Sequence, residues 1–411
     1  MSHSNDDAEL VCLGYLMLGL TGLMTPPSMP KDKDRSQDIA REVAERLHSK
    51  IEQNINLNED EQYLLSCLYG HGLAVAKDAT LAFEWALKSA EHGNAAAQYQ
   101  VGYCYKNGLG VPIDVNLAFE WLLKAAEQGF AVAENHVGYC YDDGVGVAKD
   151  EITAFGWYLK SAGQGYAAGQ NNVGSCYQNG VGVAENATRA FEWYLKAAGQ
   201  GYAIAQKNVG SCYHRGVGVT KDEALAFQWS LKSAEQGYAV AQNHIGFCYQ
   251  NGVGVAKDES SALEWYLKSA EQGYAAAQNH VACYYRFVRK DLCSAFEWSL
   301  KSAEQGYAAA QYSVGFSYRN GSVVGKDERL AFQWFLKSAE QGYAAAQKNV
   351  GDCYADGIGV AKDETRAHEW YLKSAEKGNA GAQKKINRSS SITKRHSESS
   401  DWKRGPAVKK W

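Results

Sequence analysis

Ser374 and Lys377 are the residues whose types and spacing come closest to catalytic chemistry in this sequence. In β-lactamases and penicillin-binding proteins a Ser-x-x-Lys turn supplies an activated hydroxyl, together with Ser-Asp-Asn and Lys-Thr-Gly segments. The sequence contains neither companion segment, and Ser-Ala-Glu-Gln stands at the equivalent residues 233–236 and 269–272. We therefore predict that Ser374 is a local variant of a repeated helix end, and that the chain has no catalytic residue.

Two further patterns could hold a cofactor or a metal ion. Gly-Val-Gly-Val segments, as at residues 144–147, follow no predicted strand and recur in most units, so the context of a nucleotide-binding loop is missing. His136, His244 and His280 share one position of a repeated helix, and only the last two lie in adjacent units. Packed helices about 8–10 Å apart are far apart for joint ligation. The sequence predicts no cofactor and no metal site.

The elements that carry these residues repeat along the chain. Tryptophan recurs every 36 residues from Trp85 to Trp265, then after 33 residues at Trp298, and then twice more at 36-residue steps to Trp370. This spacing defines nine units. Glycine follows the same period at Gly108, Gly144, Gly180, Gly216, Gly252, Gly321 and Gly357.

Each unit is predicted to contain two helices. In the unit that starts at Ala95, Ala97, Val101, Cys104 and Tyr105 have the spacing of one helix face. This helix should end at Gly108, because glycine adopts a positive φ at little cost. The second helix carries Ala-Phe-Glu-Trp-x-Leu-Lys and is expected to end at a second glycine such as Gly129. Its start should follow an N-cap residue, which in successive repeats is Asp114, Asp150, Asn186, Asp222, Asp258, Asp327 and Asp363.

Two short helices cannot bury their apolar faces alone, so neighbouring units must stack into a continuous core. The chain is therefore predicted to be all-α: an α-α superhelix, or solenoid, of about nine 36-residue helix-loop-helix repeats. The composition agrees, because 45% hydrophobic and 21% charged residues indicate a folded chain. A formal net charge of -4 gives no general attraction to nucleic acid.

The cysteines follow the repeat rather than a disulfide pattern. Cys104, Cys140, Cys176, Cys212 and Cys248 occur once per unit, whereas a stapled repeat needs two. We predict that they are small apolar core residues. Buried free thiols favour a reducing compartment, and the expected location is cytoplasmic.

The repeated segments resemble a known family. Ala-x-x-x-Val-Gly-x-Cys-Tyr-x-Asn-Gly-x-Gly-Val-x-x-Asp, followed by Ala-Phe-Glu-Trp-Tyr-Leu-Lys-Ser-Ala-Glu-Gln-Gly, is similar to the Sel-1-like repeat, a relative of the tetratricopeptide repeat. The resemblance extends over residues 59–385 and implies a right-handed superhelix that acts as a scaffold for protein complexes. Roles in this family range from degradation adaptors to factors that act in host cells, so the resemblance fixes no pathway.

One face of the first helices varies from unit to unit, while the core positions barely change. Aromatic and arginine side chains on such a face have the chemistry of a peptide-binding surface. They could equally pack on the helix of the adjacent unit. The candidate partner-binding residues are Tyr99, Tyr103, Tyr139, Phe247, Arg286, Tyr312, Phe316 and Arg319.

One unit departs from the pattern. Between Trp265 and Trp298 three residues are missing, and residues 285–291 replace the glycine loop with Tyr-Arg-Phe-Val-Arg-Lys-Asp. Arg286, Arg289 and Lys290 then stand together. They could mark a kink, a site for an acidic motif, or variation in a tolerant loop.

The ends of the chain differ from the repeats. Residues 1–58 are predicted to hold an apolar helix at 10–24 and an amphipathic capping helix from Ser36 to Ile55, and residues 386–411 form a basic, Ser-rich tail. The segment 10–24 is short for a bilayer span, but a membrane anchor stays an alternative to a buried helix. The tail could be a switchable anchor, an import signal or a solubilising segment.

These observations predict a non-enzymatic, monomeric adaptor that binds protein or peptide ligands on a curved helical surface and binds no specific nucleic acid. A membrane-tethered or secreted factor with the same scaffold is the alternative. An enzyme is the third possibility.

Overall fold

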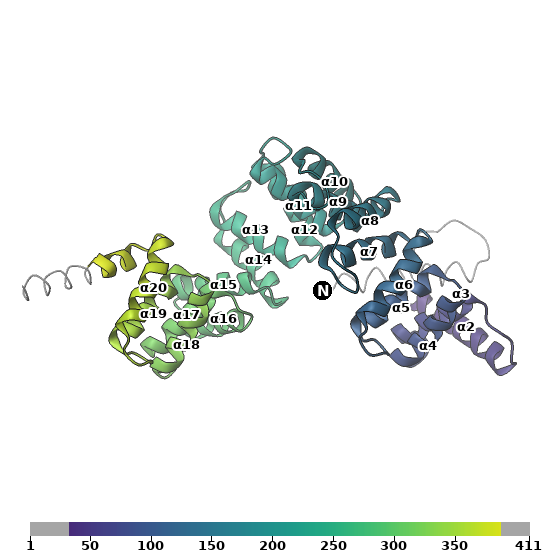
Figure 1. Ribbon diagram of the computed structural model, residues 1–411, viewed down its shortest axis with the longest axis horizontal. Coiled ribbons are helices and arrows are strands. Elements are labelled where there is room, and N and C mark those ends of the chain that lie inside the picture. Colours follow the sequence, from purple (N-terminus) through teal and green to yellow (C-terminus); the bar gives the residue numbers. More distant parts are fainter. Residues whose placement is uncertain (1–32, 388–411) are drawn as a thin grey trace, which may run out of the picture. The chain divides into compact units, whose positions relative to one another are not determined.

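The computed structural model describes residues 33–387, and helices follow one another throughout this range (Figure 1). The helices before residue 222 are α2 Lys33–Glu52, α3 Glu59–His71, α4 Ala79–Glu91, α5 Ala95–Asn107, α6 Val115–Glu127, α7 Ala131–Asp143, α8 Glu151–Gly163, α9 Ala167–Asn179, α10 Ala187–Gly199 and α11 Ala203–Arg215. Those after it are α12 Glu223–Glu235, α13 Ala239–Asn251, α14 Glu259–Glu271, α15 Ala275–Tyr284, the π-helical turn η1 Tyr285–Arg289, α16 Leu292–Glu304, α17 Ala308–Asn320, α18 Glu328–Glu340, α19 Ala344–Asp356 and α20 Glu364–Glu376.

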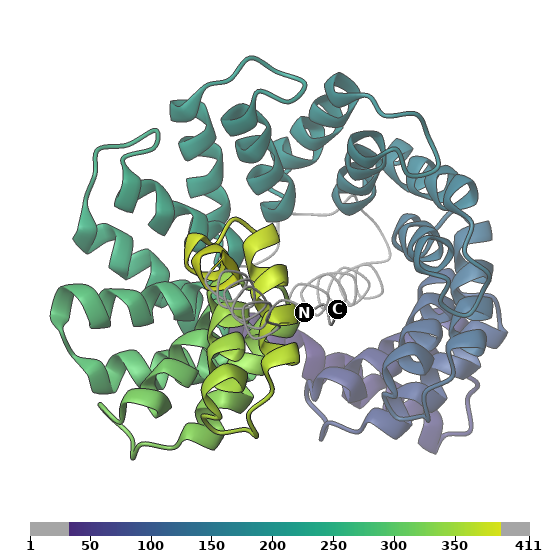
Figure 2. The ribbon, with the colours of Figure 1, turned by 60° about the vertical axis from the view of Figure 1, so that its left-hand side comes forward.

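The helices form two compact units, which divide between Lys221 and Asp222. Within each unit, successive helices lie side by side in pairs, as both views show (Figures 1 and 2). No strand occurs within residues 33–387, so the predicted all-α solenoid is confirmed. None of the helices in this range is long and apolar enough to cross a membrane. The apolar segment 10–24 and residues 388–411 lie outside the described residues.

The helix ends follow from their capping residues. Asp150 Oδ1 accepts hydrogen bonds from the backbone N–H groups of Ile152 and Thr153, at 3.1 and 3.2 Å, and so starts α8. Gly144 ends α7 at φ 71°, a left-handed conformation that favours glycine. All seven predicted N-cap residues cap a second helix. The sequence prediction of the helix ends is therefore confirmed.

A second glycine in most loops brings neighbouring repeats together. Gly182 follows α9, and a Cβ added there would lie 2.0 Å from the carbonyl oxygen of Glu151 in the preceding repeat. The same close approach recurs at Gly110, Gly146, Gly218, Gly254 and Gly359. These Gly-x-Gly loops are therefore packing elements, and this contact explains why they recur.

Glycine also allows the two helices of one repeat to touch. A Cβ on Gly246 in α13 would lie 2.7 Å from Cδ1 of Tyr266 in α14, so only glycine leaves room for the ring. The repeated first-helix valine and cysteine, such as Val209 and Cys212, are 0% and 1% exposed and confirm the predicted core face. The tryptophans of the second helices are half-buried, and a lysine Nζ lies 3.7–4.5 Å from each indole ring in all nine repeats.

A row of buried glutamines connects the two helices of a repeat to each other and to the end of the preceding repeat. Gln272 Nε2 donates to Gln242 Oε1 at 2.7 Å, and Gln242 Nε2 donates to the carbonyl oxygen of Ala234 at 3.1 Å. The first helix of each of these repeats has a buried side chain at this position, and we call the set the glutamine row. Its members are Gln98, Gln170, Gln206, Gln242, Gln278, Gln311 and Gln347, with Glu134 at the equivalent position in α7. Each is 4–7% exposed, so its hydrogen bonds form away from bulk water.

The first and the last repeat are covered by different contacts. In α2, Ala40, Val43 and Leu47 are buried in one cluster with Leu64 and Leu68 of α3, among others. This arrangement covers the first repeat with an amphipathic helix.

At the other end, Asp352 of α19 accepts hydrogen bonds from Tyr371 Oη at 2.9 Å and from Lys348 Nζ, and it forms an ion pair with Lys385 at 3.1 Å. Burial alone would raise the pKa of Asp352, but the hydrogen bonds from Lys348 and Tyr371 outweigh it, and the pKa is lowered. The charged carboxylate of Asp352 thus connects Lys385, beyond α20, to α19.

The cysteines of the repeats confirm the core prediction. Cys104, Cys140, Cys176, Cys212 and Cys248 are free and buried. Burial raises the pKa of the Cys104 thiol to about 12, so its reactive thiolate form is suppressed at neutral pH. Cys67 is disulfide-bonded.

Candidate binding site

The candidate residues of the N-terminal unit pack partly on one another. Tyr99 is half-buried, and its ring lies 5.3 Å from that of His136 and 5.7 Å from that of Phe130, both in or next to α7. Tyr103 stands 6.3 Å from Tyr99. Tyr139 is 39% exposed, and Lys106 Nζ lies 4.3 Å from its ring centroid. Tyr99 thus has a packing role between repeats, whereas Tyr139 faces solvent.

In the C-terminal unit the structure brings Arg286, Tyr312 and Phe316 to one pocket of ≈ 620 Å³ between α15, η1 and α17. Arg319 joins them, because its guanidinium lies 4.8 Å from the ring centroid of Phe316. Phe247, 40% exposed on α13, is not among the residues that line this pocket. Four of the eight candidate residues therefore meet in one place.

The turn that follows α15 positions Arg286. Where other repeats have a glycine loop, the chain continues into η1, and Lys290 takes φ 56°, a left-handed conformation that is costly for lysine. Asp291 then caps α16, accepting N–H bonds from Cys293 and Ser294 at 3.1 Å. The shortened connection is therefore an ordered π-helical turn rather than a loop, and Arg286 lies in this turn and not on the regular helix face that the sequence pattern indicated.

The pocket has an aromatic wall and a basic edge. Tyr312 contacts Phe335 and Tyr343, with ring centroids 5.7 and 5.4 Å apart, so the wall is anchored in the core. None of the described residues that line the pocket is acidic. Phe287 of η1 is 72% exposed at the same pocket. An apolar surface beside uncompensated positive charge suits an acidic ligand with an apolar side chain.

Sequence reasoning missed three of the residues that make this pocket. Phe287 was noted only as part of an irregular segment, and its exposure could not be predicted without the π-helical turn. Tyr343 precedes α19 at a position that is aromatic in most repeats, so it resembled a core residue. Ser299 of α16 replaces a large side chain, and this substitution was the available signal.

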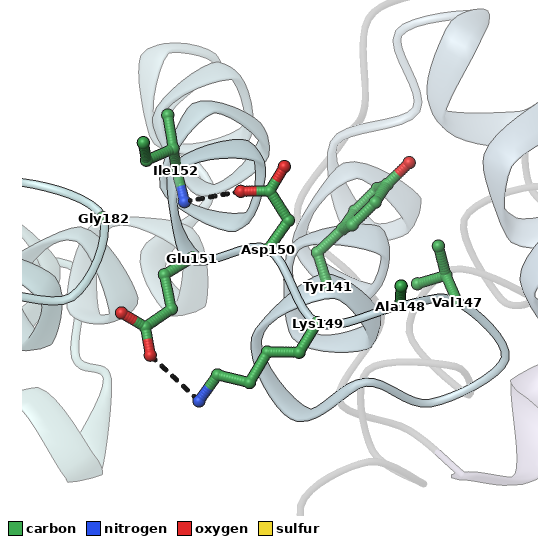
Figure 3. A pocket seen from close by; sticks show the side chains of 8 residues that line it. All are labelled: Tyr141, Val147, Ala148, Lys149, Asp150, Glu151, Ile152 and Gly182. Atoms are coloured by element: carbon green, nitrogen blue, oxygen red, sulfur yellow. Dashed lines mark hydrogen bonds and ion pairs between the residues drawn. The ribbon is translucent and has the colours of Figure 1, made fainter.

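A second hollow, of ≈ 700 Å³, lies on the loop side of the N-terminal unit (Figure 3). Its charged residues are already paired with one another or with backbone. Lys149 Nζ lies 3.0 Å from Glu151 Oε1, and Asp150 caps α8 as described above. Ile152 is 74% exposed at its edge. The hollow therefore offers less unpaired charge to a ligand than the pocket at Arg286.

The residues that suggested chemistry have structural contacts. Ser374 is 0% exposed, and its Oγ donates to the carbonyl oxygen of Ala344 at 2.7 Å. The same bond links Ser338 to Ala308 and Ser269 to Ala239. Ser374 is thus one of a series of donors that join the second helix of a repeat to the first helix of the same repeat.

The three histidines contact different aromatic rings. His136 lies 3.2 Å from Tyr99 Oη, His244 stacks with Phe247, and His280 stacks with Tyr266 at 4.6 Å. Burial lowers the pKa of His136 to about 4, so this imidazole is neutral at physiological pH. Within residues 33–387, no group of three potential metal ligands comes together.

The Sel1 repeat family matches nine consecutive segments of the chain: residues 62–94, 95–130, 131–166, 167–202, 203–238, 239–274, 275–307, 308–343 and 344–379. The chain therefore belongs to the Sel1 repeat family. The resemblance seen in the sequence is confirmed, and the fold is a solenoid of these repeats.

Two solved structures of such proteins are similar to the chain. One is c5321, described as a protective antigen present in uropathogenic Escherichia coli strains and displaying an SLR fold. Its sequence is 32% identical, the match covers 94% of this chain and 79% of that one, and the TM-score is 0.65. The other is a Sel1 repeat protein from Oxalobacter formigenes, with 25% identity, 91% and 99% coverage, and a TM-score of 0.42. No curated protein matches the chain. Sel1 repeat solenoids generally serve as scaffolds for protein interactions rather than as catalysts.

Proposed function

We propose that this protein is a non-catalytic adaptor that holds a protein ligand at the pocket between α15, η1 and α17. The observation that carries the proposal is the convergence of Arg286, Tyr312 and Phe316 on one pocket with no acidic residue among the described residues that line it. Apolar surface rimmed by unpaired charge is typical of interaction sites. Membership of a family of interaction scaffolds supports the same function.

The experiment is affinity capture with the full chain from lysate of the source cells, followed by mass spectrometry. The test variant is Arg286→Glu combined with Phe287→Ser, because both side chains lie in η1 and Phe287 is largely exposed. Replacing Tyr312 and Phe316 would be a poorer test, since both pack against the core cluster of α18 and α19. Arg189→Glu, an exposed arginine in α10, is the matched control.

We expect the test variant to lose one or more proteins that the native chain and the control variant both retain. Equal circular dichroism spectra and melting curves for the three proteins must accompany that loss. Capture of the same set of proteins by all three would refute the function at this pocket.

The location belongs to the same proposal. Cys67 is disulfide-bonded, but the buried free thiols of later repeats, such as Cys104 and Cys140, favour a reducing compartment, and we infer a cytoplasmic protein. Cell fractionation with carbonate extraction of the membranes tests this inference, because an anchored protein stays in the pellet whereas a peripheral or free one is released.

A further inference from the structure

Ser230 replaces the ring in repeat 203–238, and the repeat at residues 275–307 likewise lacks a contact that five other repeats share. In those repeats a ring of the second helix lies over a glycine of the first helix, and a Cβ added to the glycine would come within 2.6–2.8 Å of the ring. In repeat 275–307 the two positions hold Ala282 and Ser299. The glycine-ring pairs elsewhere are Gly138 with Tyr158, Gly174 with Tyr194, Gly246 with Tyr266, Gly315 with Phe335, and Gly351 with Tyr371.

The missing ring explains why the pocket exists. Ala282 and Ser299 both line it, and the only other side chain of α16 in the lining is Leu292, at the start of that helix. Val323 lines it as well, at the loop position where most repeats have the second glycine that touches the preceding repeat. Three substitutions at stacking positions therefore coincide at one pocket, and the space they leave lies beside aromatic rings of α17.

The charges at this pocket are of one sign. Arg286 lines it, Arg319 lies over Phe316, and Arg289 and Lys290 are exposed in the same segment. The neighbouring carboxylate of Asp291 is already engaged, since Oδ1 accepts two backbone N–H bonds and Oδ2 accepts the hydroxyl of Ser294 at 2.6 Å. A ligand that enters the pocket therefore meets arginine side chains whose positive charge is not balanced by this acid.

We infer that the pocket binds an acidic peptide segment of a partner protein through one aromatic side chain. The ring occupies the space beside Ser299, against Tyr312 and Phe316, and flanking carboxylates pair with Arg286 and Arg319. The inference rests on the proposed function and adds the chemistry of the partner. The basic segment 384–411 of this chain has the wrong charge to be the occupant, with nine Lys and Arg residues against two acids.

The test measures binding of fluorescein-labelled synthetic peptides to the full chain by fluorescence anisotropy. The first peptide is Asp-Glu-Asp-Trp-Asp-Glu, the second has alanine in place of tryptophan, and the third has lysine in place of each acid. We expect the first to bind at least tenfold more tightly than either of the others. Its affinity should also fall as salt is raised, because the arginine contacts are screened.

Two variants test the two halves of the site. The double variant Ala282→Gly with Ser299→Tyr builds the glycine-ring pair of the other repeats, and so fills the pocket from inside while keeping a packing that this fold already uses. It should reduce binding of the first peptide at least tenfold. Arg286→Glu, at a partly exposed side chain, should do the same without any change in the core, and Arg189→Glu should leave binding unchanged.

Equal binding of the three peptides, or unchanged binding to the folded double variant, would overturn the inference. If the double variant fails to fold, Arg286→Glu decides the result alone, and unchanged binding to it would also overturn the inference. Failure here is distinct from failure of the proposed function. If captured proteins still depend on Arg286 and Phe287 while no peptide is preferred, the adaptor function stands and only the acidic aromatic ligand is refuted.

Discussion

The buried carboxylate of Glu134 allows a direct test of the glutamine row. Its Oε2 accepts a hydrogen bond from Gln164 Nε2 at 2.8 Å, as Gln242 accepts one from Gln272 in the second helix of the same repeat. A glutamine would also donate to the carbonyl oxygen eight residues earlier, as Gln98 does to Ala90 at 3.2 Å, but a carboxylate has no hydrogen to give. We expect Glu134→Gln to stabilise the protein.

The magnitude follows from three contributions. A restored hydrogen bond adds about 1 kcal/mol, and removing a charge from a site 4% exposed adds a similar amount. Loss of charge assistance in the bond from Gln164 costs roughly 1 kcal/mol. The expected net gain is about 1 kcal/mol at pH 7, or roughly 2–4 °C in melting temperature for a unit of this size.

The stability gained by Glu134→Gln should also depend on pH. Burial raises the pKa of Glu134, against the opposing effects of Gln164 and Lys160. The contribution of this group to stability is complete below its unfolded pKa, near 4.3, and is lost as pH rises through the folded pKa. The glutamine variant has no such loss. Its advantage over the native protein should therefore be larger at pH 7 than at pH 4.

Urea unfolding followed by circular dichroism at pH 4 and pH 7 measures both quantities. Gln170→Glu is the matched reverse change one repeat later, and it should destabilise the protein by about as much as Glu134→Gln stabilises it. A loss of stability in Glu134→Gln, or an advantage that shrinks as pH rises, would refute the assignment of these hydrogen bonds.

Three further substitutions test other contacts. Gly246→Ala should destabilise the protein by about 1–3 kcal/mol in urea, because its Cβ meets the ring of Tyr266, whereas Gly156→Ala, with nothing within 4 Å, should stabilise it by up to about 1 kcal/mol. Asp352→Asn should cost about 1–2 kcal/mol at pH 7. That difference should shrink as pH falls below the unfolded pKa, because a lowered pKa contributes stability above the unfolded value and loses it as pH falls through the folded one. Equal stability of the two proteins at pH 7 would exclude a stabilising role for the contacts of Asp352. Ser374→Ala should cost about 1 kcal/mol in the same unfolding assay, and a hydrolase activity that disappears in this variant would contradict the structural role.

The fold could be predicted because the residues that stack the repeats recur in most units. The period of Trp85, Trp121 and their successors defines the repeat, and N-caps such as Asp150 and helix ends such as Gly144 follow from local chemistry that one repeat already contains. The glutamine row was not predicted. It depends on which buried position of one repeat faces the end of the preceding repeat, and sequence spacing alone does not give that direction.

The candidate site could be predicted only in part. Tyr312, Phe316 and Arg319 stand on one helix face, so their grouping follows from helical spacing. Arg286 reaches the same pocket because η1 redirects the chain, and a π-helical turn has no reliable signal in a single sequence. The packing of Tyr99 on His136 also depends on contacts between repeats, which the variable face of one helix does not show.

The pocket shows how a repeat array can gain a specific site by losing a stacking contact. Repeat 275–307 lacks the ring that would lie over Ala282. Leu263 of the preceding repeat also stands where other repeats have the phenylalanine that forms an edge-to-face pair with a tyrosine of the next repeat, as Phe227 does with Tyr249. Each loss removes apolar contact that neighbouring repeats retain. A ligand ring beside Ser299 would restore part of that contact. The repeat that departs furthest from the common pattern is therefore the one where a bound partner would restore the most apolar contact.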